Sequence, residues 1–296
     1  MSDLAGDYYF SSADGLRLYC AVYGTDRPGT VPVLCLPGLT RNSRDFAVLA
    51  RRLSSRRQVL AADLRGRGRS EWDGDPSRYQ PGTYVQDAWS LLDARRVSRV
   101  LVIGTSLGAL IGMTMAAMAP QRIAGLVLND AGPEIDPVGA RRIASYVGRL
   151  PQVSSWSEAA AQAKTVYGAA LPGLSDAQWL DYARRGYREN EAGVPVADVD
   201  PRIAEAFRTP ATAAPADLWT LYARIRNVPM LVIRGALSDI LSATTVARMV
   251  REQPQVECVT VANRGHAPLL DEHECVAAID AFVARHGSRA PSPGPG

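Results

Sequence analysis

The stretch at residues 104–108 constrains this chain most, because it places a serine between two glycines where a strand meets a helix. It reads Gly-Thr-Ser-Leu-Gly, and Ser106 is its centre. The apolar residues 100–103 before it are typical of a buried strand, and residues 109–118 after it predict a buried helix. So tight a turn strains the serine backbone and requires small flanking residues. The serine oxygen is then exposed at a helix N-terminus, where free N–H groups favour negative charge.

Strand and helix signals alternate along most of the chain. Asp14-Gly15 lies between two runs rich in aromatic and apolar residues, which predicts an antiparallel hairpin at the start. The later alternation predicts parallel strands joined by right-handed crossovers. We therefore expect an α/β fold with a mostly parallel eight-stranded sheet flanked by helices. The predicted strands cover residues 8–10, 16–23, 31–36, 58–63, 100–103, 123–130, 230–235 and 256–261.

Residues 132–215 interrupt this alternation, since they carry helix signals and no apolar strand. Ser155 and Ser175 each begin a capping-box pattern, and Asp200-Pro201 is typical of a helix start. We expect a core of residues 1–131 and 216–287, with a helical cap at 132–215 between its two parts. Residues 288–296 have the composition of a disordered tail.

Composition limits the partners and cofactors. The net charge is only +3, and the arginines are spread along the chain, which does not favour nucleic-acid binding. The four cysteines are far apart and form no C-x-x-C, so no metal is expected. Gly66-x-Gly68 lacks the third glycine of a dinucleotide fingerprint, so no cofactor is expected either. Without a signal peptide or an apolar span, we expect a cytoplasmic protein that binds a small molecule and no membrane. The oligomeric state stays open.

A nucleophilic serine needs a base, and that base needs a carboxylate to orient it. The expected base is His266, in a glycine-containing loop after the last predicted strand; His273 and His286 lie in polar surroundings on the last predicted helix. Two aspartates follow strands between the serine and the histidine. We favour Asp239 over Asp130, although the order Ser, Asp, His holds for either.

Further candidates concern the oxyanion and the substrate. Two backbone N–H groups should hold the oxyanion, those of Leu107 and Leu39. Aromatic residues of the insertion could cover an apolar acyl pocket, and Trp156 and Trp179 are the candidates. Arg41, beside the oxyanion loop, is a candidate for binding a substrate carboxylate.

These motifs together resemble the α/β-hydrolase fold family, in its serine-nucleophile esterase and lactonase branch with a helical cap. The resemblance rests on four stretches, at residues 63–70, 104–108, 234–239 and 265–268. Pro37-Gly38 departs from the His-Gly that family members commonly have before the oxyanion residue. The resemblance implies a serine hydrolase acting on a carboxylic ester, lactone or thioester. A carbon–carbon bond hydrolase, a cofactor-free perhydrolase or a non-hydrolytic small-molecule receptor are the alternatives.

Overall fold

A single eight-stranded sheet forms the centre of the computed structural model, which describes residues 4–208 and 217–288. The strand order is β1-β2-β4-β3-β5-β6-β9-β10. Strand β2 pairs antiparallel with both β1 and β4, and every pair from β4 to β10 is parallel. This confirms the predicted sheet. The strands are β1 (Leu4–Ser11), β2 (Arg17–Tyr23), β3 (Val33–Leu36), β4 (Val59–Ala62), β5 (Val100–Thr105), β6 (Ile123–Asn129), β9 (Met230–Gly235) and β10 (Glu257–Val261).

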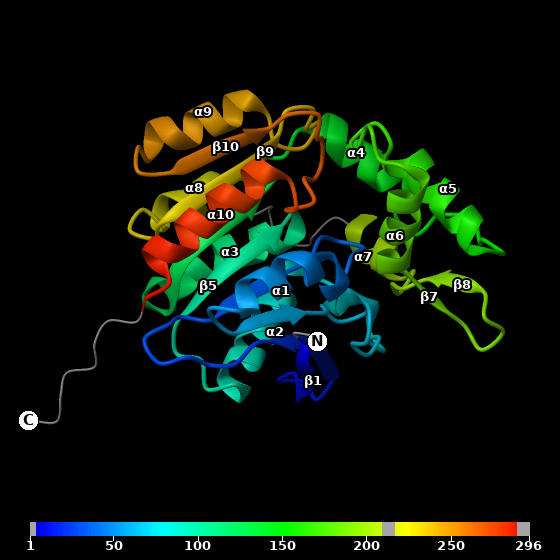
Figure 1. Cartoon of the computed structure of the whole chain (residues 1–296), viewed down its shortest axis with the longest axis horizontal. Coiled ribbons are helices and arrows are strands. Elements are labelled where there is room, and N and C mark those ends of the chain that lie inside the picture. Colours follow the sequence, from blue (N-terminus) through cyan, green and yellow to red (C-terminus); the bar gives the residue numbers. More distant parts are fainter. Residues whose placement is uncertain (1–3, 209–216, 289–296) are drawn as a thin grey trace, which may run out of the picture.

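Helices cover both faces of this sheet (Figure 1). One face packs against α2, α3, α8 and α9, and the other against α1 and α10. The central strands β3, β4, β5 and β6 are buried along their length, as expected for parallel strands covered on two sides. These helices are α1 (Ala47–Ser54), α2 (Pro81–Ala94), α3 (Leu107–Met118), α8 (Leu218–Arg224), α9 (Ala243–Glu252) and α10 (His273–His286).

The insertion between β6 and β9 forms a separate layer beside one edge of the core (Figure 1). Its helices follow the predicted pattern, and Ser175 forms a complete capping box with Gln178. One element differs from the prediction: a short antiparallel hairpin, β7–β8, joins the helices. The described elements are α4 (Pro137–Tyr146), α5 (Trp156–Tyr167), α6 (Asp176–Gly186), β7 (Tyr187–Glu189), β8 (Pro195–Ala197) and α7 (Ile203–Arg208). Most of the predicted tail, residues 289–296, lies outside the described residues.

Short polar contacts join the insertion to the core at several places, two of which lie after different strands of the sheet. Arg142 of α4 forms an ion pair with Asp239, just after β9. On the other side, the Asn42 side-chain amide donates to the Arg185 carbonyl, and Arg44 pairs with Asp198. The insertion is therefore held over the carboxyl ends of the strands from both sides.

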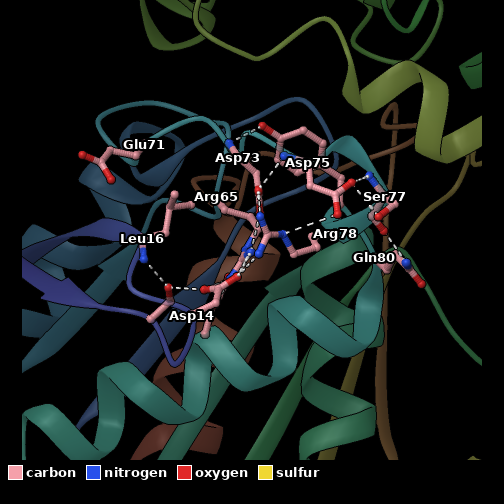
Figure 2. A network of polar contacts seen from close by, with 12 residues as sticks. Asp14, Leu16, Arg65, Glu71, Asp73, Asp75, Ser77, Arg78 and Gln80 are labelled. Atoms are coloured by element: carbon pink, nitrogen blue, oxygen red, sulfur yellow. Dashed lines mark hydrogen bonds and ion pairs between the residues drawn. The ribbon is translucent and has the colours of Figure 1, made fainter.

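A buried arginine organises the loop between β4 and α2 (Figure 2). The Arg65 guanidinium is almost fully buried and bonds three carboxylates, those of Asp14, Asp73 and Asp87. Arg78 adds a second positive charge next to Asp73. This network links the first hairpin, the loop after β4 and helix α2.

Candidate active site

Ser106 lies in the strained turn that the sequence predicts, between β5 and α3. Its backbone has φ 53° and ψ −115°, and non-glycine residues rarely adopt such a positive φ. The neighbouring backbone comes too close for any side chain at either glycine. A Cβ atom on Gly104 would lie 2.3 Å from the Gly108 carbonyl carbon, and one on Gly108 would lie 2.0 Å from the Leu36 oxygen. The two glycines therefore make this turn possible.

A continuous line of hydrogen bonds runs from Ser106 into the core. Ser106 Oγ lies 2.8 Å from His266 Nε2. His266 lies in the loop between β10 and α10, and its Nδ1 is 2.8 Å from Asp130 Oδ2. The structure thus brings together the predicted nucleophile and the predicted base, with a carboxylate behind them.

Asp130 is held rigidly at the end of β6. Its side chain is fully buried, and its backbone has a φ of 56°. Its carboxylate accepts hydrogen bonds from the Gly235 backbone N–H at 2.8 Å and from the Ser238 hydroxyl at 2.6 Å. These two donors fix the position of the carboxylate behind His266.

Asp239, which the sequence analysis favoured as the orienting acid, forms a different contact. Its two oxygens bond the Arg142 guanidinium at 2.5 and 2.8 Å, and no hydrogen bond joins it to His266 within the described chain. The hydrogen bond from Arg142 lowers the pKa of Asp239. The preference for Asp239 over Asp130 was therefore wrong. Strands β6 and β9 are parallel neighbours, so the aspartates that follow them lie at the same edge of the sheet. The sequence signal that could have identified Asp130 was its position at the end of a strand.

The two predicted oxyanion donors lie beside Ser106. Leu39 lines the same cavity as Ser106, and Leu107 is the first residue of α3, so its N–H has no partner within the helix. Neither amide donates a hydrogen bond to any other described residue. The Arg67 guanidinium donates to the Leu39 carbonyl at 2.9 Å and so fixes this loop.

A cavity of about 90 Å³ opens at Ser106 and His266, between the core and the insertion. The insertion contributes tyrosines rather than the predicted tryptophans. Trp179 is buried among the insertion's own helices, Trp156 bonds Glu189, and neither lines this cavity. Both tryptophan predictions are therefore wrong as contacts of this cavity. The aromatic residues of the insertion that line it are Tyr146, Tyr167 and Tyr182.

Arg41 lines this cavity, as the sequence analysis anticipated, but its charge is already matched. Its guanidinium bonds both oxygens of Asp45, at 2.7 and 2.5 Å, and stacks 4.2 Å from the centre of the Tyr182 ring. Burial alone would lower the pKa of Arg41, but the Asp45 carboxylate more than offsets this and raises it. The Asp45 carboxylate therefore offsets the Arg41 charge, and binding of a substrate carboxylate by Arg41 stays a prediction.

The described residues contain no group of three or more His, Cys, Asp or Glu side chains arranged to hold a metal ion. None of their helices combines the length and the apolar character needed to cross a membrane.

Comparison with known proteins places this geometry in a family. The model of the alpha/beta hydrolase family matches residues 33–278. A 3-hydroxybutyrate-oligomer hydrolase from Cupriavidus necator is 35% identical over 84% of this chain and 87% of its own length. A 2-(acetamidomethylene)succinate hydrolase from Mesorhizobium japonicum is 26% identical over 90% of this chain and 91% of its own.

A solved structure gives the same result. The crystal structure of an alpha/beta hydrolase from Novosphingobium aromaticivorans is 45% identical and superposes with a TM-score of 0.91, over 96% of this chain and 99% of that one. The similarity thus extends along nearly the whole chain. The chain belongs to the alpha/beta hydrolase family.

Proposed function

We propose that this protein is a serine hydrolase that cleaves carboxylic esters through an acyl-enzyme intermediate. The observation that carries the proposal is the line Ser106–His266–Asp130, with both hydrogen bonds at 2.8 Å. A serine in a strained turn, a base within hydrogen-bond reach and a buried carboxylate behind it are the parts that nucleophilic acyl transfer needs.

Each part has one task in the proposed reaction. Ser106 Oγ attacks the ester carbonyl while His266 Nε2 takes its proton, and the Leu39 and Leu107 N–H groups hold the oxyanion. The C–O bond to the alcohol then breaks, and His266 returns the proton to the leaving oxygen. Water, deprotonated by His266, attacks the acyl-enzyme, and Ser106 leaves with the proton as the acid is released. Asp130 keeps His266 in the tautomer that this sequence requires.

Similarity to relatives narrows the substrate class. The Cupriavidus necator relative is a hydrolase of 3-hydroxybutyrate oligomers, which are esters of a short hydroxy acid. We therefore infer that esters of short hydroxy acids are the first substrates to test here. Lactones and thioesters react through the same tetrahedral intermediate and belong in the same panel.

Covalent labelling tests the mechanism. A fluorophosphonate should label the wild-type protein stoichiometrically, and Ser106→Ala should abolish the labelling while leaving the melting temperature nearly unchanged. Turnover of p-nitrophenyl acetate should disappear in the same variant. Labelling of a different serine would contradict the mechanism. Tight ligand binding with no turnover in the wild type would favour a non-hydrolytic receptor.

A further inference from the structure

A second cavity, of about 160 Å³, lies next to the cavity at Ser106. Most of its lining belongs to the insertion, on the helices α4, α5, α6 and α7 and the segment after β8, and Thr40 and Arg41 of the core complete it. Six residues line both cavities, so the two share one wall. These residues are Thr40, Arg41, Tyr146, Val147, Tyr167 and Tyr182.

Stacked side chains form most of this shared wall. The Tyr146 and Tyr167 rings are 5.7 Å apart, and the Tyr167 and Tyr182 rings 5.3 Å apart. Arg41 lies over the Tyr182 ring and is tied to Asp45 in the core. The partition between the cavities is therefore made mainly of side chains. A substrate chain that occupies both cavities has to pass between these side chains.

The lining of the second cavity selects for an uncharged, mainly apolar group. Many of its residues are aliphatic, among them Ala163, Val166 and Ala183. The charged side chains in the wall are already paired, since Asp200 bonds Arg202 and Arg41 bonds Asp45. A charged group entering this cavity would therefore lose its water without gaining an unpaired opposite charge.

The volume also limits what can enter. An apolar cavity of about 150 Å³ in another protein binds benzene, which has six heavy atoms. A cavity of about 160 Å³ therefore accommodates one group of similar size. A short hydroxyacyl unit, with an ester group and a methyl branch, has that size.

We propose that the second cavity holds the unit adjoining the scissile ester, so that the substrate is an ester chain of at least two short hydroxyacyl units. This inference rests on the proposed function, because it places the bond to be broken at Ser106. The cleavage step itself is unchanged: water adds across one ester bond, and an acid and an alcohol leave.

Filling the second cavity tests the proposal. Ala163, on α5, lines only the second cavity, so Ala163→Leu should reduce its volume without touching Ser106. We expect kcat/KM for the methyl ester of a 3-hydroxybutyrate dimer to fall at least tenfold, and kcat/KM for p-nitrophenyl acetate to change less than twofold. Ala161→Leu is the matched control, because Ala161 is exposed on the opposite side of α5.

Two results would overturn the proposal: no change for the dimer, or an equal loss for dimer and acetate in a folded variant. If Ala163→Leu fails to fold, Val166→Phe fills the same cavity from the same helix. Both variants are to be checked by circular dichroism and by fluorophosphonate labelling at Ser106.

Binding separates this proposal from the proposed function. In a Ser106→Ala background, calorimetry should show the dimer methyl ester binding at least tenfold tighter than the monomer methyl ester, and Ala163→Leu should remove that difference. Because this measurement needs no turnover, it can support the cavity proposal even if the protein hydrolyses no ester. Equal affinity for dimer and monomer would reject it even in an active esterase.

Discussion

At the scale of single residues, the roles of Asp130 and Asp239 can be compared directly. Each follows one of two neighbouring strands, but only Asp130 bonds His266. We expect Asp130→Asn to lower kcat for p-nitrophenyl butyrate by about 10⁴, since an amide there favours the wrong histidine tautomer. Asp239→Asn should lower kcat by less than tenfold, because it weakens only the contact with Arg142. Steady-state kinetics on folded variants measures both. The opposite ranking would return the orienting role to Asp239.

The buried carboxylate of Asp63, directly after β4, makes the stability of the protein depend on pH. Burial raises the pKa of Asp63 from 3.8 to about 6, although the Arg69 and Ser43 N–H groups bond its carboxylate and oppose the rise. The folded state therefore holds this proton more tightly than the unfolded state does. The contribution of Asp63 to stability is largest below pH 3.8 and declines as the pH rises through about 6.

Urea unfolding measures this effect. Between pH 4.5 and 7, the free energy of unfolding of the wild type should fall relative to that of Asp63→Asn by about 2 kcal/mol. Replacement by asparagine shifts the baseline stability, so the pH dependence of the difference is the readout. A difference that stays constant with pH would show that the Asp63 carboxyl titrates normally.

At the scale of secondary-structure elements, the aromatic residues of α5 and α6 have two different roles, lining the cavities and packing inside the insertion. Tyr167, at the end of α5, lines both cavities, whereas Trp179 of α6 is 3% exposed and packs inside the insertion against Tyr182. We expect Tyr167→Ala to change the ranking of p-nitrophenyl esters from acetate to octanoate, with fluorophosphonate labelling of Ser106 altered by less than threefold.

Trp179→Ala is the comparison. Removing this buried ring should lower stability by about 3–5 kcal/mol, as large-to-small changes in a core do. Thermal unfolding and limited proteolysis measure that loss, and the ester ranking should stay as in the wild type at a temperature where the variant is folded. A changed ranking in Trp179→Ala alone would assign the pocket wall to the tryptophan.

At the scale of the whole molecule, the Arg65 network ties the first hairpin to α2 and to the loop after β4 (Figure 2). Arg65→Met would leave the buried carboxylates of Asp73 and Asp87 without their main cation, which costs about 3–5 kcal/mol. Arg78→Met is the control, because its side chain is 45% exposed and such pairs contribute about 1 kcal/mol or less. Urea unfolding of both variants tests this difference, and equal losses would contradict it.

Local patterns in the sequence were enough for most of the fold. Apolar runs of four to six residues predicted the central strands, because a strand buried on both faces needs an unbroken apolar stretch. The strained turn at Ser106 and the loop at His266 could be predicted for the same reason, since each depends on neighbours in sequence. The hairpin β7–β8 was missed because its strands have three residues each and only one buried residue each.

The sequence by itself therefore determined the strained serine, the histidine loop and the sheet that carries them. Only the tertiary structure decided between Asp130 and Asp239 and between tyrosines and tryptophans at the cavity. Parallel neighbours β6 and β9 end at the same edge, so chain order cannot distinguish their aspartates. The choice depends on the Gly235 and Ser238 donors that hold Asp130, and on Arg142, which the insertion brings to Asp239. Contacts between segments about 100 residues apart leave no local pattern to read.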